Sequence, residues 1–182
     1  LYVILAEFGY VTKKTLYDKF LVNGQKLGAH PDRFSLPGIE LPSGSLGYGL
    51  SIGAGVALAN KLNNRNHNVF ILLGDGECNE GTIWEAAMFA SHHNLDNLVA
   101  IIDYNHLQGF GTTDEVLNLE PLTDKFNSFG WSVYKIDGHD FQQLNDTFEN
   151  VIKTGNGPSI IIAETIKGKG YSKFENKLSS HY

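Results

Sequence analysis

Hydrophobic residues in this chain fall into short continuous runs that alternate with longer, mixed stretches. Two runs, Val69–Leu73 and Leu98–Ile102, are typical of strands buried on both faces, and Trp131–Ile136 and Pro158–Thr165 predict two further strands. The stretches beside them predict helices at Leu46–Leu62, Thr82–His93, Pro121–Phe129 and Phe141–Lys153. A shorter helix pattern that includes Leu16 and Phe20 ends at Asn23-Gly24, before a loop rich in glycine and proline.

This alternation predicts an α/β fold with a parallel sheet and helices on both faces. Strands joined by helices of about ten residues form right-handed crossovers, which place the helices over the sheet. Ligands of such sheets bind at the carboxyl ends of the strands. Functional residues are therefore expected just after Leu73, Ile102, Ile136 and Thr165.

Two local patterns add detail to the predicted helices. The sequence Thr82-Ile83-Trp84-Glu85 has the spacing of a capping box, with Thr82 as the cap. Leu46–Leu62 contains four glycines, at positions 47, 49, 53 and 55. Because a glycine inside a helix costs about 1 kcal/mol relative to alanine, we expect close packing or a bound ligand to require them.

Composition narrows the class of protein. The 182 residues are 42% hydrophobic and 19% charged, as in ordinary globular proteins, and no apolar run approaches the length of a membrane span. Cys78 is the one cysteine, which excludes an internal disulfide framework and indicates a reducing, cytoplasmic setting. The net charge of −6 and the scattered basic residues disfavour nucleic-acid binding, so a small molecule or a protein is the expected partner.

Candidate chemistry follows the first two predicted strands. Gly74-Asp75-Gly76-Glu77 comes after one and Asp103-Tyr104-Asn105-His106-Leu107 after the other. Asp75 offers a charged oxygen and Asn105 an amide oxygen, ligands that suit Mg²⁺ when phosphate oxygens complete its octahedron. The alternative is that Gly-Asp-Gly only forms a tight turn. The chain lacks both the P-loop and the Gly-x-Gly-x-x-Gly patterns of nucleotide-binding proteins.

The two stretches resemble the thiamine-diphosphate motif, and the sequence around them is similar to transketolase. The similar segments are Gly74 to Gly81 with Trp84 to Ala87, Leu95 to Leu98, Asp103 to Asn105, and Ile166 to Gly170. They extend over nearly the whole chain. The resemblance implies the α/β diphosphate-binding domain of that family, with thiamine diphosphate and Mg²⁺ as cofactors.

The resemblance also implies roles for individual residues. The Mg²⁺ ligands are Asp75, Asn105 and the carbonyl of Leu107. The expected cofactor site comprises Gly74, Gly76, Glu77, Asn105 and His181, together with Gly44, Ser45 and Leu46 from a segment similar to the family's Gly-Pro-Leu-Gly loop. The expected catalytic residues are His30, which faces the substrate, Glu80, which communicates with a partner's catalytic glutamate, and His181, near the diphosphate and donor substrate.

Some positions depart from the family pattern. Ser45 stands where the family has proline, Tyr48 where glutamine is common, and Gly109-Phe110 where Ile-Asp follows Leu-Gln. The departures at Tyr48, Gly109 and Phe110 bear on the shape of the pocket over the thiazolium. Cys78 also departs from the pattern and is interpreted as a packing residue.

A partner is expected because the family's catalytic glutamate lies on a separate pyrimidine-binding domain. Residues 1–182 resemble only the diphosphate-binding half, incomplete at its N-terminus, as in the N-terminal subunit of a split transketolase. The first hypothesis is a subunit that transfers a ketol unit between sugars or sugar phosphates once a pyrimidine-binding subunit completes the site, with self-association as well. The alternatives are a subunit devoted to an unusual sugar and a non-catalytic scaffold.

Overall fold

The computed structural model describes residues 1–181, except for the side chain of Thr154. The chain divides into two compact units, Leu1–Leu46 and Gly47–Tyr182, which are described separately. The first unit holds helices α1 (Tyr2–Glu7) and α2 (Lys13–Lys19) and a long loop. Its core is small and consists of Leu5, Leu27, Leu36 and Ile39, so most of its hydrophobic side chains remain exposed.

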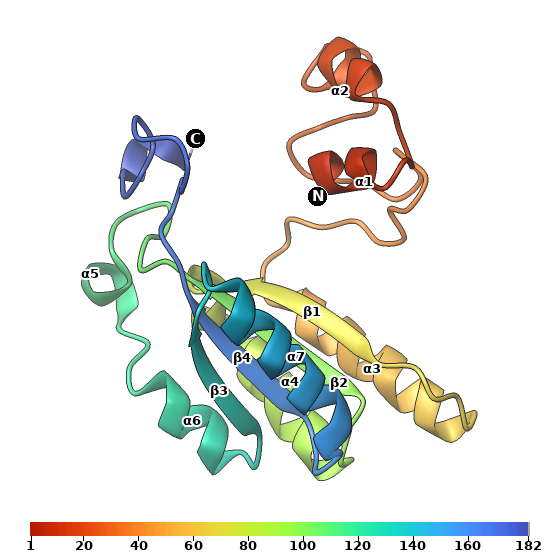
Figure 1. Cartoon of the computed structure of the whole chain (residues 1–182), viewed down its shortest axis with the longest axis vertical. Coiled ribbons are helices and arrows are strands. Elements are labelled where there is room, and N and C mark those ends of the chain that lie inside the picture. The colour runs from red at the N-terminus through yellow and green to blue at the C-terminus, as the bar shows by residue number, and fades with distance from the viewer. Residues whose placement is uncertain (182) are drawn as a thin grey trace. The chain divides into compact units, whose positions relative to one another are not determined.

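The second unit is built on a four-stranded parallel sheet, as the alternating pattern predicts. Its strands are β1 (Val69–Gly74), β2 (Leu98–Tyr104), β3 (Ser132–Asp137) and β4 (Ser159–Glu164), in the order β1-β2-β4-β3 (Figure 1). The register pairs Gly74 with Asp103 and Tyr104 with Glu164. The carboxyl ends of β1, β2 and β4 therefore meet at one edge of the sheet.

Helices cover both faces of this sheet. The covering helices are α3 (Tyr48–Leu62), α4 (Gly81–His92), α6 (Leu122–Ser128) and α7 (Phe141–Thr154); the unit also contains α5 (Thr113–Leu117) and the short 3-10 helices η1 (Gly76–Asn79) and η2 (Leu178–Ser180). Side chains of α3, α4 and α6 pack in one cluster with β1, β2 and β4, while α7 packs on the opposite face (Figure 1). The predicted two-sided fold is confirmed.

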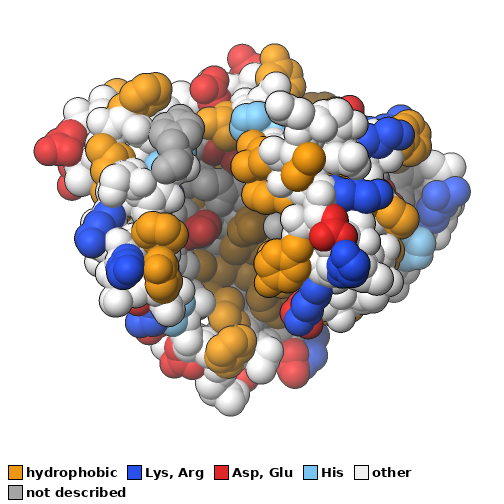
Figure 2. Space-filling view, turned by 90° about the horizontal axis from the view of Figure 1, so that it is seen from above, with side chains coloured by type: hydrophobic (Ala, Val, Ile, Leu, Met, Phe, Trp, Pro, Cys, Tyr) orange, Lys and Arg blue, Asp and Glu red, His pale blue; other side chains and the backbone are white. Residues whose placement is uncertain are grey.

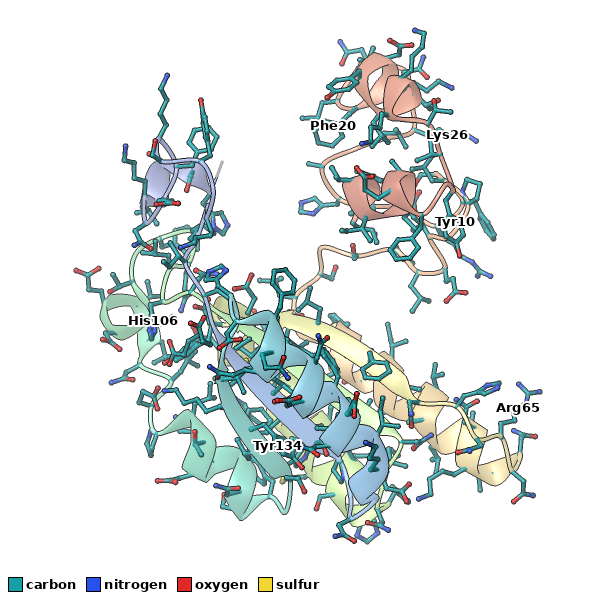
Figure 3. All side chains as sticks on the ribbon, viewed as in Figure 1. Tyr10, Phe20, Lys26, Arg65, His106 and Tyr134 are labelled. Carbon is teal, nitrogen blue, oxygen red and sulfur yellow. The ribbon has the colours of Figure 1, made fainter. Side chains whose placement is uncertain are left out.

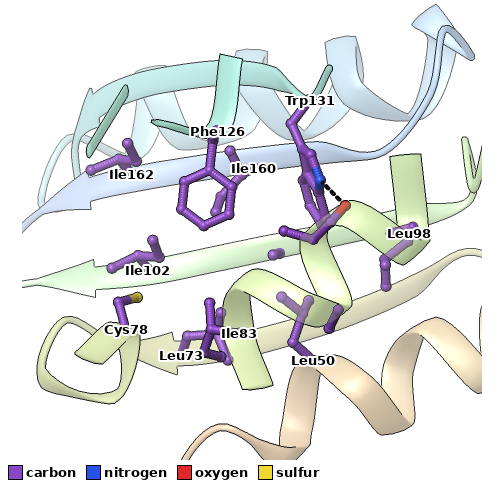
Figure 4. Close-up of a cluster of buried hydrophobic side chains, with 14 of the residues drawn as sticks. Leu50, Leu73, Cys78, Ile83, Leu98, Ile102, Phe126, Trp131, Ile160 and Ile162 are labelled. Atoms are coloured by element: carbon purple, nitrogen blue, oxygen red, sulfur yellow. Dashed lines mark hydrogen bonds between the residues drawn. The ribbon is translucent and has the colours of Figure 1, made fainter. Parts of the chain in front are cut away.

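The larger core lies between the sheet and the helices α3, α4 and α6 (Figure 4). Trp131 is buried there and donates a hydrogen bond from Nε1 to the carbonyl of Ala87 at 2.9 Å, which satisfies its polar atom. Cys78 is fully buried in the same cluster, and burial raises the pKa of its thiol to about 12. The interpretation of Cys78 as a packing residue is confirmed.

The capping box predicted at Thr82 is wrong. Helix α4 begins at Gly81, its N-cap is Glu80, and no side chain caps it. Thr82 lies inside the helix, and its hydroxyl is buried without a hydrogen-bond partner among the described residues. A capping box does occur at α5, where Thr112 accepts from the amide of Glu115 at 3.2 Å and Glu115 accepts from Thr112.

The glycines of the predicted helix Leu46–Leu62 differ in their surroundings. Gly47 precedes α3 as its N-cap, with a left-handed φ of 85°. Gly53 is buried against β1, and a Cβ there would lie 2.5 Å from Cγ1 of Ile71. Gly55 faces open space instead. Close packing therefore explains Gly53 but does not explain Gly55.

Charged side chains of both signs occur on the face of the molecule seen in Figure 2. Figure 2 shows Lys and Arg beside Asp and Glu, with hydrophobic side chains between them. In the described part of the chain, no helix has both the length and the apolar character needed to cross a membrane.

The two helical glycines give a matched pair of stability predictions. Gly53→Ala should lower the free energy of unfolding by about 1 to 3 kcal/mol, because the added methyl group overlaps Ile71. Gly55→Ala should raise it by about 0.5 to 1 kcal/mol, because alanine favours the helix and nothing obstructs it. Urea unfolding of both variants measures the difference, and equal effects would show that Ile71 does not restrict position 53.

Candidate functional site

Asp75 lies at the centre of the candidate site, just beyond β1. Its Oδ1 accepts a hydrogen bond from the amide of Gly76 at 2.6 Å. Its Oδ2 accepts from the amides of Asn105 at 3.0 Å and His106 at 2.6 Å, directly after β2. The side chain is only 3% exposed. The structure therefore joins the two predicted ligand segments through one carboxylate.

Burial dominates the ionisation of this carboxylate. Removal from water raises the pKa of Asp75 above its usual value, and the negative charge of Asp103 acts in the same direction. The backbone amides of Gly76, His106 and Asn105 lower the pKa and offset only part of this effect. A cation beside Asp75 would stabilise the ionised form, so the site fits a metal ion.

Asn105 opens a tight hairpin that shapes the edge of the site. Its Oδ1 accepts from the amide of Leu107 at 3.1 Å, and the next residue, His106, has a left-handed φ of 64°. Leu107 pairs with Thr112 across the hairpin. The two hydrogen bonds of this bridge use the carbonyls of His106 and Gly111, not that of Leu107. The amide oxygen of Asn105 retains a second lone pair for another partner.

Gly76 is required by the close approach of Gln108. A Cβ at position 76 would lie 2.9 Å from Cγ of Gln108. The side-chain amide of Gln108 in turn donates a hydrogen bond from Nε2 to Oδ1 of Asn79 at 2.7 Å. The absence of a side chain at Gly76 thus lets the hairpin lie against the turn after β1. The amide of Gly76, the expected diphosphate donor, is bound to Asp75 here.

Glu77 joins the turn after β1 to the start of α3. One of its carboxylate oxygens accepts from the amide of Gly47 at 2.8 Å, and the other accepts from the amide of Gly74 at 3.1 Å. Both oxygens therefore accept from backbone amides, one at the start of α3 and one at the end of β1. Glu77 supports the shape of the site, and its predicted contact with the cofactor stays a prediction.

Glu80 is exposed at the N-terminus of α4, close to the start of α3. A Cβ on Gly47 would lie 2.8 Å from Cβ of Glu80 and 2.3 Å from the hydroxyl of Thr82. The structure thus places Glu80 beside the α3 N-cap. Its role toward a partner subunit stays a prediction.

His181 lies within electrostatic reach of Asp75, although the two are far apart in sequence. Burial lowers the pKa of His181, and the positive charge of Lys167 lowers it further, while Asp75 acts in the opposite direction. The structure therefore brings the C-terminal segment to the same edge of the sheet. Lys167 belongs to the segment Ile166 to Gly170 on which the resemblance rests.

The remaining predicted residues belong to the first unit, where two of them are neighbours. Gly44 has a φ of 119°, and a Cβ there would lie 2.5 Å from Nδ1 of His30. Ser45 and Leu46 follow at exposed positions. The loop and the histidine that the sequence assigns to cofactor and substrate therefore lie side by side within this unit.

The structure adds a polar network that the sequence patterns do not indicate. His106, labelled in Figure 3, contacts Oε2 of Glu164 through Nε2 at 2.9 Å, and Lys135 pairs with Oε1 of Glu164 at 2.7 Å. Burial acts to raise the pKa of Glu164, but these two partners outweigh it and lower the pKa. Glu164 ends β4, Lys135 lies within β3 and His106 follows β2, and only the register of the sheet brings the three together.

The donor set explains why protein ligands alone do not complete a metal site. Among the residues that the structure describes, no group of three or more His, Cys, Asp or Glu side chains could hold an ion. The three predicted ligands, one carboxylate, one amide oxygen and one backbone carbonyl, would leave the other half of an octahedron to other oxygens. Mg²⁺ commonly binds in this way, with one or two carboxylates and the phosphates of a ligand.

Solved structures place this fold in a known class. A transketolase from Leishmania mexicana matches with a TM-score of 0.89 and 27% identity over 98% of this chain and 28% of that one. A transketolase from Campylobacter jejuni matches with a TM-score of 0.83 and 32% identity over 89% of this chain and 26% of that one. The chain thus has the fold of a transketolase diphosphate-binding domain.

Sequence comparison identifies the family. The family described as "Transketolase, thiamine diphosphate binding domain" matches residues 1–182, and the chain belongs to it. One subunit of the apulose-4-phosphate transketolase of Phocaeicola vulgatus is 41% identical over 100% of this chain. The 6-deoxy-6-sulfo-D-fructose transketolase subunit SqwG of Clostridium sp. MSTE9 is 44% identical over the same share. The chain spans 64% and 66% of the lengths of these relatives.

Because the pKa of Asp75 is raised in the folded chain, we expect the free energy of unfolding to depend on pH. The folded chain holds the Asp75 proton more tightly than the unfolded chain, in which an aspartate has a pKa of about 3.9. In the absence of cations, the stability of the natural protein relative to Asp75→Asn should therefore fall as pH rises from about 4 through the raised pKa. Urea unfolding of both proteins between pH 4 and 7 measures this difference, which a pH-independent offset would contradict.

Proposed function

We propose that this chain binds the diphosphate of thiamine diphosphate through Mg²⁺ at the ends of β1 and β2. Asp75, the side chain of Asn105 and the carbonyl of Leu107 are the proposed metal ligands. The observation that carries the proposal is the buried Asp75 carboxylate, which holds the amides after β2 and has no cationic side chain against it among its described hydrogen bonds. A divalent cation and its phosphate ligands match this chemistry.

We infer further that the whole protein transfers a two-carbon ketol unit from a ketose to an aldose. When bound, thiamine diphosphate supplies the carbanion that such a transfer requires. This chain's own part is to hold the diphosphate and to place polar groups near the reacting sugar. His181 is near enough to Asp75 for the two charges to interact, and His30 lies beside Gly44, so these two imidazoles are the proposed hydrogen-bonding groups for substrate.

A partner subunit with a pyrimidine-binding domain is proposed to complete the active site. Relatives of this chain are named as transketolase subunits. In addition, the exposed positions of α3 carry no charge; they are Tyr48, Ser51, Ile52, Gly55, Val56, Ala59 and Leu62. A helix that is apolar on nearly all sides is usually covered by other protein. Glu80 lies next to the start of this helix, which agrees with its proposed role at an interface.

The proposed substrate class is an unusual sugar in place of, or beside, the common pentose phosphates. The relatives described above are named for apulose-4-phosphate and 6-deoxy-6-sulfo-D-fructose. The departures at Ser45, Tyr48, Gly109 and Phe110 point the same way, and Phe110 is 86% exposed at the tip of the hairpin beside Asn105. Ketol transfer assayed over a panel of ketoses tests this, and activity on common pentose phosphates alone would contradict it.

Ligand binding gives a direct test of the cofactor site. Mg²⁺ with thiamine diphosphate should stabilise the chain, by about 2.7 kcal/mol at a hundredfold excess over the dissociation constant. Asp75→Ala should lose this stabilisation, whereas Asp124→Ala, which removes an exposed carboxylate on α6, should keep it. Thermal-shift titration measures the effect. An unchanged shift in Asp75→Ala, or no shift even with the partner present, would favour the non-catalytic scaffold.

Partner dependence is tested by activity. The isolated chain should show little ketol transfer, and addition of a subunit with the pyrimidine-binding domain should restore it. The measurement is turnover of the purified chain with and without the second subunit, at saturating Mg²⁺ and thiamine diphosphate. Robust turnover by the chain alone would overturn the proposal of a shared active site.

A further inference from the structure

The turn between β3 and α7 is fixed more firmly than the start of a helix requires. Asp140 caps α7 by accepting from the amides of Gln142 and Gln143. Asp137 accepts from the amide of His139 at 2.8 Å, and Gly138 donates to the carbonyl of Glu164 at 2.8 Å. The turn is thus held to its own helix and also to the end of β4.

Gly138 allows this turn to lie directly against the end of β4. A Cβ at position 138 would be 2.6 Å from Cγ2 of Thr165 and 3.0 Å from the carbonyl oxygen of Glu164. Any larger residue would therefore push the turn away from the chain that leaves β4. The close approach places His139 within hydrogen-bond distance of that chain.

His139 accepts a backbone hydrogen bond from the residue two positions after β4. The amide of Ile166 donates to Nε2 of His139 at 2.8 Å. A backbone amide can only donate, so Nε2 must carry a lone pair. In a neutral imidazole the proton then lies on Nδ1, and a doubly protonated ring could not make this bond. The contact therefore requires one tautomer of His139.

Ile166 begins the segment that leads to Lys167 and His181. Just before it, Thr165 donates to the carbonyl of Tyr104 at 3.0 Å and its hydroxyl donates to Asp103. Beyond it, the segment folds on itself, since Asn176 donates to the carbonyl of Lys167 at 3.0 Å. The bond to His139 thus fixes the backbone one residue before Lys167.

We propose that His139 is a positioning residue, whose neutral Nδ1–H tautomer holds the segment from Ile166 to His181 at the edge of the site. Its effect on the ligand rests on the proposed function, because Lys167 and His181 act there only if the diphosphate binds beside Asp75. The anchoring itself depends only on the contact between His139 and Ile166. The two parts can be measured separately.

Limited proteolysis tests the anchoring in the full chain. The segment contains trypsin sites at Lys167, Lys169, Lys173 and Lys177. His139→Phe keeps an aromatic ring but removes the nitrogen that accepts from the amide of Ile166. His139→Gln offers a carboxamide oxygen near the position of Nε2 as a replacement acceptor. Cleavage at these sites should be about 2- to 10-fold faster in His139→Phe, as loss of one hydrogen bond predicts, and near normal in His139→Gln. His67→Phe, an exposed histidine elsewhere, is the control.

Equal cleavage rates in the natural protein and His139→Phe would overturn the anchoring. Cleavage of His139→Gln as fast as that of His139→Phe would also overturn it. Nitrogen-15 NMR of the natural protein provides the answer if His139→Phe does not fold. The proposal requires the shifts of a neutral imidazole protonated at Nδ1 and a slowly exchanging amide at Ile166. An imidazolium, or an Nε2–H tautomer, would overturn it.

Titration with Mg²⁺ and thiamine diphosphate tests the effect on the site. His139→Phe should weaken binding by the same factor of about 2 to 10, and His139→Gln should restore it. Faster cleavage with unchanged affinity would overturn the link between His139 and the ligand. If the natural protein binds no thiamine diphosphate, the proposed function fails, while proteolysis and NMR still decide the anchoring.

Discussion

The candidate site depends on one buried charge. Asp75 leaves β1 at a point where the parallel register places Asp103 opposite Gly74, so the chain after β2 passes directly over its carboxylate. Backbone amides from both segments then bind its oxygens. A buried carboxylate is costly unless it is well paired, and these neutral donors compensate only part of the cost, as the raised pKa shows. A bound cation would compensate the remaining cost of burying this negative charge.

Much of the second unit is predictable from its sequence because three of its four strands contain continuous apolar runs between turn residues. Buried parallel strands such as Leu98–Tyr104 carry this signal on both faces, and ligand-binding residues follow their ends. A local sequence pattern does not identify the N-cap of a helix when a neighbouring residue can also serve as the cap. Thr82 and Thr112 both stand three residues before a glutamate, but Glu80 precedes the first helix and already serves as its N-cap.

Other features of the site could not be read from the sequence because they depend on tertiary contacts. The bonds from Asn105 and His106 to Asp75 use backbone amides, which every residue except proline has. Glu77 carries a carboxylate that could bind a ligand, yet both of its oxygens accept hydrogen bonds from backbone amides. The pairing of His139 with Ile166 links residues whose spacing has no recognisable period. Such contacts follow from register and loop shape.

Glu77 also has a thermodynamic consequence. Its two oxygens join the amide at the start of α3 to the amide of Gly74, next to the Asp75 turn. A protein that covers the exposed, uncharged positions of α3 would therefore also restrict the loop at Asp75, where we propose that the ligand binds. Binding free energies are reciprocal, so a ligand that orders this loop favours the same protein contact by an equal factor. Binding of the proposed partner and binding of the proposed cofactor would then share one coupling free energy.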